Sequence, residues 1–546
     1  MSNQKTLDDL EQDLVKQAVE NIAAKVGAKK TSDPKMKDII AIVERFIKKH
    51  ELVCYGGTAI NNILPEEAQF YDKKTEIPDY DFYSPKALEH AKDLADEFYE
   101  NGFSEVEAKS GMHHGTYKVF VNFVGIADIT QLDPTLFKNI HADAIKVDGI
   151  LYAPPNLLRM GMYLELSRPE GDVSRWEKVS KRLALLNKHH PLRAEGCTPD
   201  KLRIPFQTPT HLKPNQRVES PTVDEIDATV SSNDNEEVRM FRAVRNAFID
   251  DDLVFFGGYA ISHYARHLPK YEKALFAQIP HFDVLSVDPE ASARKVKERL
   301  EDNDFKNVVI TQHSGIGEIV PEHYEIAVKN NDPIAFIYKP VACHSYNVIQ
   351  VGKKRVRIAS TDTMLSLYLA MIYTDKPYYD AKRILCMCKY LYDIQQRNRL
   401  KRSGLLRRFG ITCYGKQETL DDIKAKKSEK YQELKRSDPE FEEWFLKYSP
   451  MEYFEHEYSI KKNKLTVKRS PNVKSVAKSA KASPGKSVAK SPSKSPSKSP
   501  SKSAKASPVK SPSKSIKLTP KKTTKTKKKK TKKKSSTLKK LFKLIT

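Results

Sequence analysis

The sequence predicts a mixed α/β protein (α+β) with two tandem units of similar fold, the second one degenerate, followed by a disordered basic tail. Three observations support this prediction. An apolar strand, a Gly-Gly turn and a helix start run from Leu52 to Ile60, and an Asp-x-Asp strand closes the stretch at Ser84. A similar pattern returns between Leu253 and Ser286. After Lys461 the chain consists largely of Lys, Ser and Pro, with too few apolar residues for a core.

The first stretch places a phosphate-binding turn beside two carboxylates. Gly56, Gly57 and Thr58 begin a helix, whose unpaired N–H groups attract anions, and the glycines let a phosphate approach the backbone. Asp79 and Asp81 alternate along a strand, so they project from the same face. Each motif alone is ordinary, because Gly-Gly-Thr is most often a turn and Asp-x-Asp a solvated strand edge. Together they suit a divalent metal that meets a nucleoside triphosphate.

Comparison of the two copies indicates which of these residues are not required for folding. In the second copy Tyr259 replaces the threonine and His281 the first aspartate, while Asp283 is kept. The strand 116–121 also resembles 323–328 at an offset of 207, which carries Asp128 onto Ala335. A repeat that keeps its apolar frame and loses its carboxylates suggests that Asp79, Asp81 and Asp128 serve chemistry in the first copy.

A Gly-Gly-Thr/Ser turn, an Asp-x-Asp and a third Asp on a later strand resemble the DNA polymerase β-like nucleotidyltransferases. The run 156–169 and the basic residues around 175–182, with the doubled unit, resemble the poly(A) polymerase catalytic subunits of poxviruses and giant DNA viruses. The resemblance covers roughly residues 40 to 400. Gly57 and Asp79 are further apart than is usual in this superfamily, so residues 65–76 are expected to form an extra loop.

The resemblance implies a template-independent poly(A) polymerase that adds AMP from ATP to an RNA 3′ end. Two ions of Mg²⁺ or Mn²⁺ would be held by Asp79 and Asp81, with Asp128 on the ion nearest the 3′-hydroxyl. The turn 56–58 would cradle the phosphates through backbone N–H groups and the Thr58 hydroxyl. Lys178, Lys181 and Arg182, on one face of a predicted helix, would hold the triphosphate or the RNA; the alternative is a solvated helix face.

Two other functions stay open from the sequence. One is a nucleotidyltransferase that needs no RNA primer, such as an oligoadenylate or cyclic-dinucleotide synthase. The other is a non-catalytic RNA-binding scaffold, which the intact acidic triad of the first unit disfavours. The resemblance further implies a viral protein of the virion and the host cytoplasm, with processivity supplied by a homodimer or a separate viral factor.

Composition and charge set the predicted boundaries. They are a helical segment 1–34, a catalytic unit 35–195, a linker 196–236, a degenerate unit 237–460 and the tail 461–546. The tail holds 30 Lys and Arg and no acid, leaving 65 basic and 70 acidic residues before it. It suits nucleic-acid phosphates, a nuclear signal or Ser-Pro phosphorylation. No apolar run is long enough to span a membrane, and the six cysteines are expected to be reduced intracellular thiols.

Overall fold

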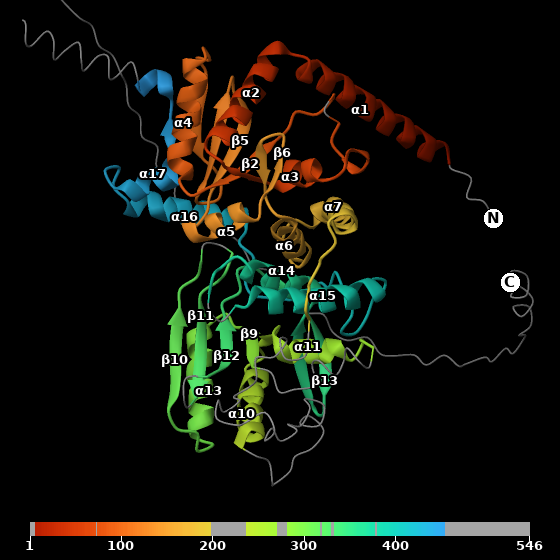
Figure 1. Cartoon of the computed structure of the whole chain (residues 1–546), viewed down its shortest axis with the longest axis vertical. Coiled ribbons are helices and arrows are strands. Elements are labelled where there is room, and N and C mark those ends of the chain that lie inside the picture. Colours follow the sequence, from red (N-terminus) through yellow and green to blue (C-terminus); the bar gives the residue numbers. More distant parts are fainter. Residues whose placement is uncertain are drawn as a thin grey trace, which may run out of the picture. The chain divides into compact units, whose positions relative to one another are not determined.

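The computed structural model describes residues 6–72, 74–197, 236–269, 281–316, 319–328, 332–376 and 379–453 (Figure 1). The predicted tail and nearly all of the predicted linker lie outside these ranges. The mixed α/β class predicted from the sequence is confirmed, with two eight-stranded mixed sheets in the described residues.

The first sheet has the strand order β16-β3-β4-β5-β2-β1-β7-β6. Its strands are β1 Val53–Tyr55, β2 Tyr80–Ser84, β3 Val106–Ser110, β4 Thr116–Val121, β5 Val124–Gln131, β6 Ile145–Val147, β7 Ile150–Tyr152 and β16 Lys447–Tyr448. The pairs β2–β5 and β1–β7 are parallel, and the other neighbours are antiparallel.

The second sheet repeats this topology in seven strands, and the eighth differs: β16 lies beside β3, whereas β15 lies beside β13, the counterpart of β6 at the other edge. Its order is β10-β11-β12-β9-β8-β14-β13-β15, with β9–β12 and β8–β14 as the parallel pairs. Its strands are β8 Val254–Phe255, β9 Phe282–Leu285, β10 Val308–His313, β11 His323–Val328, β12 Asp332–Tyr338, β13 His344–Val351, β14 Lys354–Ala359 and β15 Cys413–Tyr414. The internal repeat seen in the sequence is therefore a repeat of fold.

One detail of the predicted repeat is wrong. In the first sheet Asp81 pairs with Asp128, and in the second Asp283 pairs with Phe336. The counterpart of Asp128 is therefore Phe336 and not Ala335. The cause is the hairpin turn, because two residues join β4 to β5 and three separate β11 from β12. A constant offset cannot cross that insertion.

Helices cover the sheets in the same way in both units. In the first, α2 and α4 pack on the sheet and on each other, and in the second α10 and α13 do so (Figure 1). The helices of the first unit are α1 Leu7–Thr31, α2 Pro34–Lys49, α3 Gly56–Ile63, α4 Ala87–Glu100, α5 Pro134–Ala142, α6 Pro155–Leu166 and α7 Trp176–His189. Those that follow are α10 Glu236–Asp250, α11 Gly258–Ala265, α13 Pro289–Glu301, α14 Thr361–Met371, α15 Ala381–Arg397, α16 Leu420–Glu433 and α17 Pro439–Phe445.

Helix α2 shows why the sequence folds as predicted. Asp33 caps its N-terminus by accepting from Lys35 N, and Pro34 takes the first helical position. The apolar positions recur at helical spacing and are buried: Ile39, Ile42, Val43, Phe46 and Ile47. The predicted helix α1 is also present, but none of its residues is buried.

The two units share a helical core. Helix α14 is buried along its whole length and packs against α6 of the first unit and α15 of the second. The Tyr163 hydroxyl donates to Gln395 Oε1 at 3.2 Å within this contact. Helices α16 and α17 lead into β16, which pairs with β3 of the first sheet. The last part of the range assigned to the degenerate unit thus completes the first sheet.

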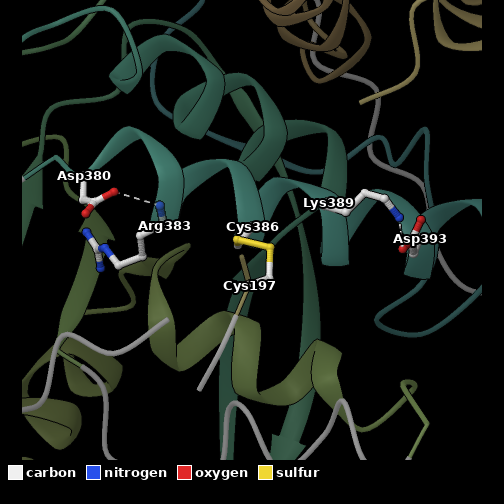
Figure 2. Close-up of a disulfide and its surroundings, with 6 residues drawn as sticks. All are labelled: Cys197, Asp380, Arg383, Cys386, Lys389 and Asp393. Atoms are coloured by element: carbon white, nitrogen blue, oxygen red, sulfur yellow. Dashed lines mark hydrogen bonds and ion pairs between the residues drawn. A yellow bond between two sulfur atoms is a disulfide. The ribbon is translucent and has the colours of Figure 1, made fainter. Parts of the chain in front are cut away.

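The expectation of six reduced thiols is wrong. Cys197 and Cys386 form a disulfide with a Cα–Cα distance of 5.6 Å (Figure 2). Cys343 and Cys413 form a second, with a Cα–Cα distance of 5.2 Å. The partners are 189 and 70 residues apart in the chain, so only the tertiary fold brings them together. Cys54 and Cys388 are free and buried.

Candidate active site

Three predicted carboxylates meet at one part of the first sheet. Strands β2 and β5 are parallel neighbours, and their register sets Asp81 directly beside Asp128. Along β2 the side chains of Tyr80, Phe82 and Ser84 are buried, so Asp81 lies on the opposite face. Asp79 comes two residues earlier and is exposed. The sheet topology thus gathers residues that are 49 positions apart in sequence.

The electrostatics of this cluster disfavour the ionised form of Asp79 and Asp81. Burial first, and then the charges of Asp79 and Asp128, raise the pKa of Asp81 from 3.8 to about 7. Asp79 is exposed as a residue, but partial desolvation of its carboxylate and the charge of Asp128 also raise its pKa. Like charges held together disfavour ionisation, and divalent cations reverse that effect. The donor set therefore fits Mg²⁺ or Mn²⁺, which prefer carboxylate oxygens.

The three aspartates do not bring their carboxylate oxygens within 4.8 Å of one another. Among the described residues, the one group of acidic, Cys or His side chains whose ligand atoms all lie within 4.8 Å is Glu170, Cys343 and Cys413. The two cysteines of that group form a disulfide, so they are not available as thiolates. In the aspartate cluster Lys118 forms an ion pair with Asp128.

Lys118 is a site residue that sequence reasoning missed. It lies on β4 in register with Asp128, and its charge lowers the pKa of both Asp79 and Asp81. The repeat contained a signal for it, because the aligned residue of the second unit is Glu325. There the charge is reversed, and Glu325 pairs instead with His313 at 2.8 Å.

The glycine turn lies against the carboxylates. Gly56 has a φ of +74°, which favours glycine, and a Cβ there would lie 2.6 Å from Asp81 Oδ2. Gly56 begins helix α3, so the free N–H groups of its first turn lie beside the aspartates. The Thr58 hydroxyl donates to the backbone carbonyl of Asp79 at 2.7 Å. Thr58 thus fixes the strand that carries Asp79, which leaves its backbone N–H for the predicted phosphate role.

Helix α7 brings two predicted basic residues to the site. Lys178 is exposed, and its charge lowers the pKa of Asp79. Arg182 lies beside the turn, because a Cβ on Gly57 would be 2.9 Å from its Nη1. Lys181, the third basic residue of this predicted face, forms an ion pair with Glu177 at 2.7 Å instead.

The corresponding place in the second unit has a different chemistry. Asp283 is 8 % exposed and pairs with His281 at 3.1 Å. A Cβ on Gly257 would lie 1.8 Å from Asp283 Oδ2, so the carboxylate itself fills the space beside the turn. Phe336 takes the position of the third aspartate. One carboxylate with a histidine partner does not make a two-metal site.

Comparison with known proteins adds an independent observation. Residues 41–172 match the family model of the poly(A) polymerase catalytic subunit. The match contains the three aspartates and the glycine turn, and it confirms the resemblance found in the sequence.

Curated relatives carry the same description. The chain is 31 % identical over 192 residues to a putative poly(A) polymerase catalytic subunit of Acanthamoeba polyphaga mimivirus, covering 33 % of this chain and 32 % of the relative. It is 33 % identical over 159 residues to a putative poly(A) polymerase catalytic subunit of African swine fever virus (strain Badajoz 1971 Vero-adapted), covering 28 % of this chain and 33 % of the relative. The aligned region thus spans about a third of these viral relatives.

The fold has a solved counterpart. The structure of the Megavirus polyadenylate synthase matches with a TM-score of 0.67 at 19 % identity, over 86 % of this chain and 92 % of that one. The likeness therefore extends over both units and supports the fold class predicted from the sequence.

Proposed function

We propose that this chain is a template-independent poly(A) polymerase that transfers AMP from ATP to the 3′ end of RNA. The observation that carries the proposal is the register of β2 and β5, which sets Asp81 beside Asp128 next to the Gly-Gly turn. The match of residues 41–172 to the poly(A) polymerase catalytic subunit family supports the choice of reaction.

Each residue has a chemical task in this proposal. Asp79, Asp81 and Asp128 would hold two Mg²⁺ or Mn²⁺ ions, which supply charge neutralisation and a lower pKa for the 3′-hydroxyl. The 3′-oxygen forms a bond to the α-phosphorus of ATP, the bond to the β-phosphate breaks, and pyrophosphate leaves. The N–H groups of the 56–58 turn and the charges of Lys178 and Arg182 stabilise the phosphates as negative charge moves onto the leaving group.

Extension of a labelled RNA primer with each of the four NTPs tests the proposal. Wild type with Mg²⁺ or Mn²⁺ is expected to build long tails from ATP, and Asp79→Ala with Asp81→Ala to build none. Incorporation of all four nucleotides would contradict the choice of ATP. Turnover of ATP without RNA would indicate the primer-independent synthase, and binding of RNA without turnover the scaffold.

The partners and the location are part of the same proposal. The relatives are viral proteins, and we place this one in the virion and the host cytoplasm. Processivity would come from a homodimer or from a separate viral factor. Light scattering of the purified chain would detect the homodimer, and light scattering of complexes from infected cells would detect the separate factor. No helix of the described residues has the length and apolarity that a membrane span requires.

A further inference from the structure

The predicted extra loop, residues 65–76, is anchored at Phe70 and Tyr71 beside the Gly-Gly turn. Asn61 lies on α3 and is 2 % exposed. Its Oδ1 accepts from the backbone N–H groups of Phe70 at 2.8 Å and Tyr71 at 2.9 Å. A buried amide that satisfies two successive N–H groups fixes the backbone of that segment. The loop is thus anchored to the helix that begins at the Gly-Gly turn.

The loop in turn holds an arginine. Arg182 of α7 donates from Nη2 to the Tyr71 hydroxyl at 2.6 Å. Its guanidinium carbon lies 4.7 Å from the ring centre of Phe70 and 5.3 Å from that of Tyr71. Stacking and a hydrogen bond both restrict the orientation of the guanidinium group.

Tyr71 and Arg182 both contact the first turn of α3. A Cβ on Gly57 would lie 2.5 Å from Tyr71 Oη and 2.9 Å from Arg182 Nη1. Positive charge and helix N–H groups therefore converge at Gly57, the residue after the Gly56 that contacts Asp81.

The charge of Arg182 has no acidic partner among the described residues. Its basic neighbours do have partners, since Arg175 pairs with Glu165 at 3.2 Å and Lys181 with Glu177 at 2.7 Å. Arg182 is held instead by a neutral phenol and two rings. An oriented guanidinium that no carboxylate neutralises is suited to an external phosphate.

We propose that Tyr71 is a positioning residue and that, with Arg182, it forms a subsite for the terminal phosphates of the nucleoside triphosphate. The inference rests on the proposed function and deepens it, because it assigns the extra loop to recognition of the pyrophosphate leaving group. The subsite distinguishes ATP and pyrophosphate from AMP, which lacks those phosphates.

Equilibrium binding of ATP, pyrophosphate and AMP to the full chain with Mg²⁺ tests this subsite. Tyr71→Phe removes one hydroxyl and keeps the ring, and it is expected to raise the Kd for ATP and pyrophosphate about five- to tenfold. Arg182→Ala should raise both by a larger factor, while the Kd for AMP stays within twofold of wild type. Lys181→Ala, on the same helix, is the matched control and should change none of the three.

Steady-state extension gives a second readout. In Tyr71→Phe the KM for ATP should rise while kcat at saturating ATP changes less than twofold, which a general loss of structure would not produce. Equal weakening of AMP and ATP, no change in either variant, or no binding of ATP to wild type would overturn the subsite. If ATP and pyrophosphate bind as predicted but no RNA is extended, the subsite stands and the proposed polymerase function fails.

Discussion

Asp81 is the residue on which the electrostatics of the site converge. It is largely buried, it lies beside two other carboxylates, and its pKa is raised to about 7. In the unfolded chain the same group has a pKa of about 3.8. Between pH 3.8 and about pH 7 the Asp81 carboxylate therefore takes up a proton when the protein folds. The free energy of unfolding of the metal-free protein therefore falls as the pH rises through this window.

Asp81→Asn should stabilise the metal-free protein at pH 8 by on the order of 1–2 kcal/mol, because the ionised carboxylate is then absent. The advantage should disappear near pH 4, where both proteins are neutral at this position. Urea unfolding in EDTA at the two pH values measures it. Equal stability of the two proteins at pH 8 would contradict the electrostatic account.

Lys118 should set the pH dependence of activity. Its charge lowers the pKa of Asp79 and Asp81, so Lys118→Met should raise both values. The acidic limb of the pH–rate profile is then expected to move up by about half to one unit, and activity to fall more at pH 6.5 than at pH 8.5. Lys109→Met is the matched control, since Lys109 is 42 % exposed against 41 % for Lys118 and pairs with Glu107. An unshifted profile in Lys118→Met would exclude this role.

At the scale of elements, the site depends on how helix α3 is joined to strand β2. Thr58 is 4 % exposed, and its hydroxyl ties the helix to the backbone carbonyl of Asp79. This hydrogen bond joins residues that lie before and after the extra loop 65–76 in the chain, and it holds Asp79 in position.

Thr58→Val keeps the volume and removes the hydroxyl. It should lower the free energy of unfolding by about 1–3 kcal/mol, because a carbonyl loses its buried donor, and reduce kcat about tenfold. Thr58→Ser should restore most of both. Unchanged kcat in a folded Thr58→Val protein would show that this bond does not position Asp79.

Local patterns allowed much of this to be predicted from the sequence. The buried face of α2 and the three aspartates follow from periodicity and from the repeat, which depend on neighbours in the chain. The counterpart of Asp128 was misplaced because one extra residue lies after β11. The disulfide of Cys197 and the pairing of β16 with β3 depend on contacts between distant segments, for which the sequence has no local signal.

At the scale of the whole molecule, two units of one topology carry different chemistry. The first keeps three carboxylates and a basic neighbour around its turn. In the second, Asp283 is buried against the turn and paired with His281, and Phe336 replaces the third acid. The shared core around α14 indicates that the two units pack together, and the loss of carboxylates from the second unit predicts one active centre per chain.

The most direct measurement is RNA primer extension with ATP by two matched variants, Asp81→Asn and Asp283→Asn. They change the same position of the repeat in the same way. We predict that Asp81→Asn abolishes tail synthesis while its fold is intact, and that Asp283→Asn retains it. Tail synthesis by Asp81→Asn, or equal loss in a folded Asp283→Asn protein, would contradict the assignment of catalysis to the first unit.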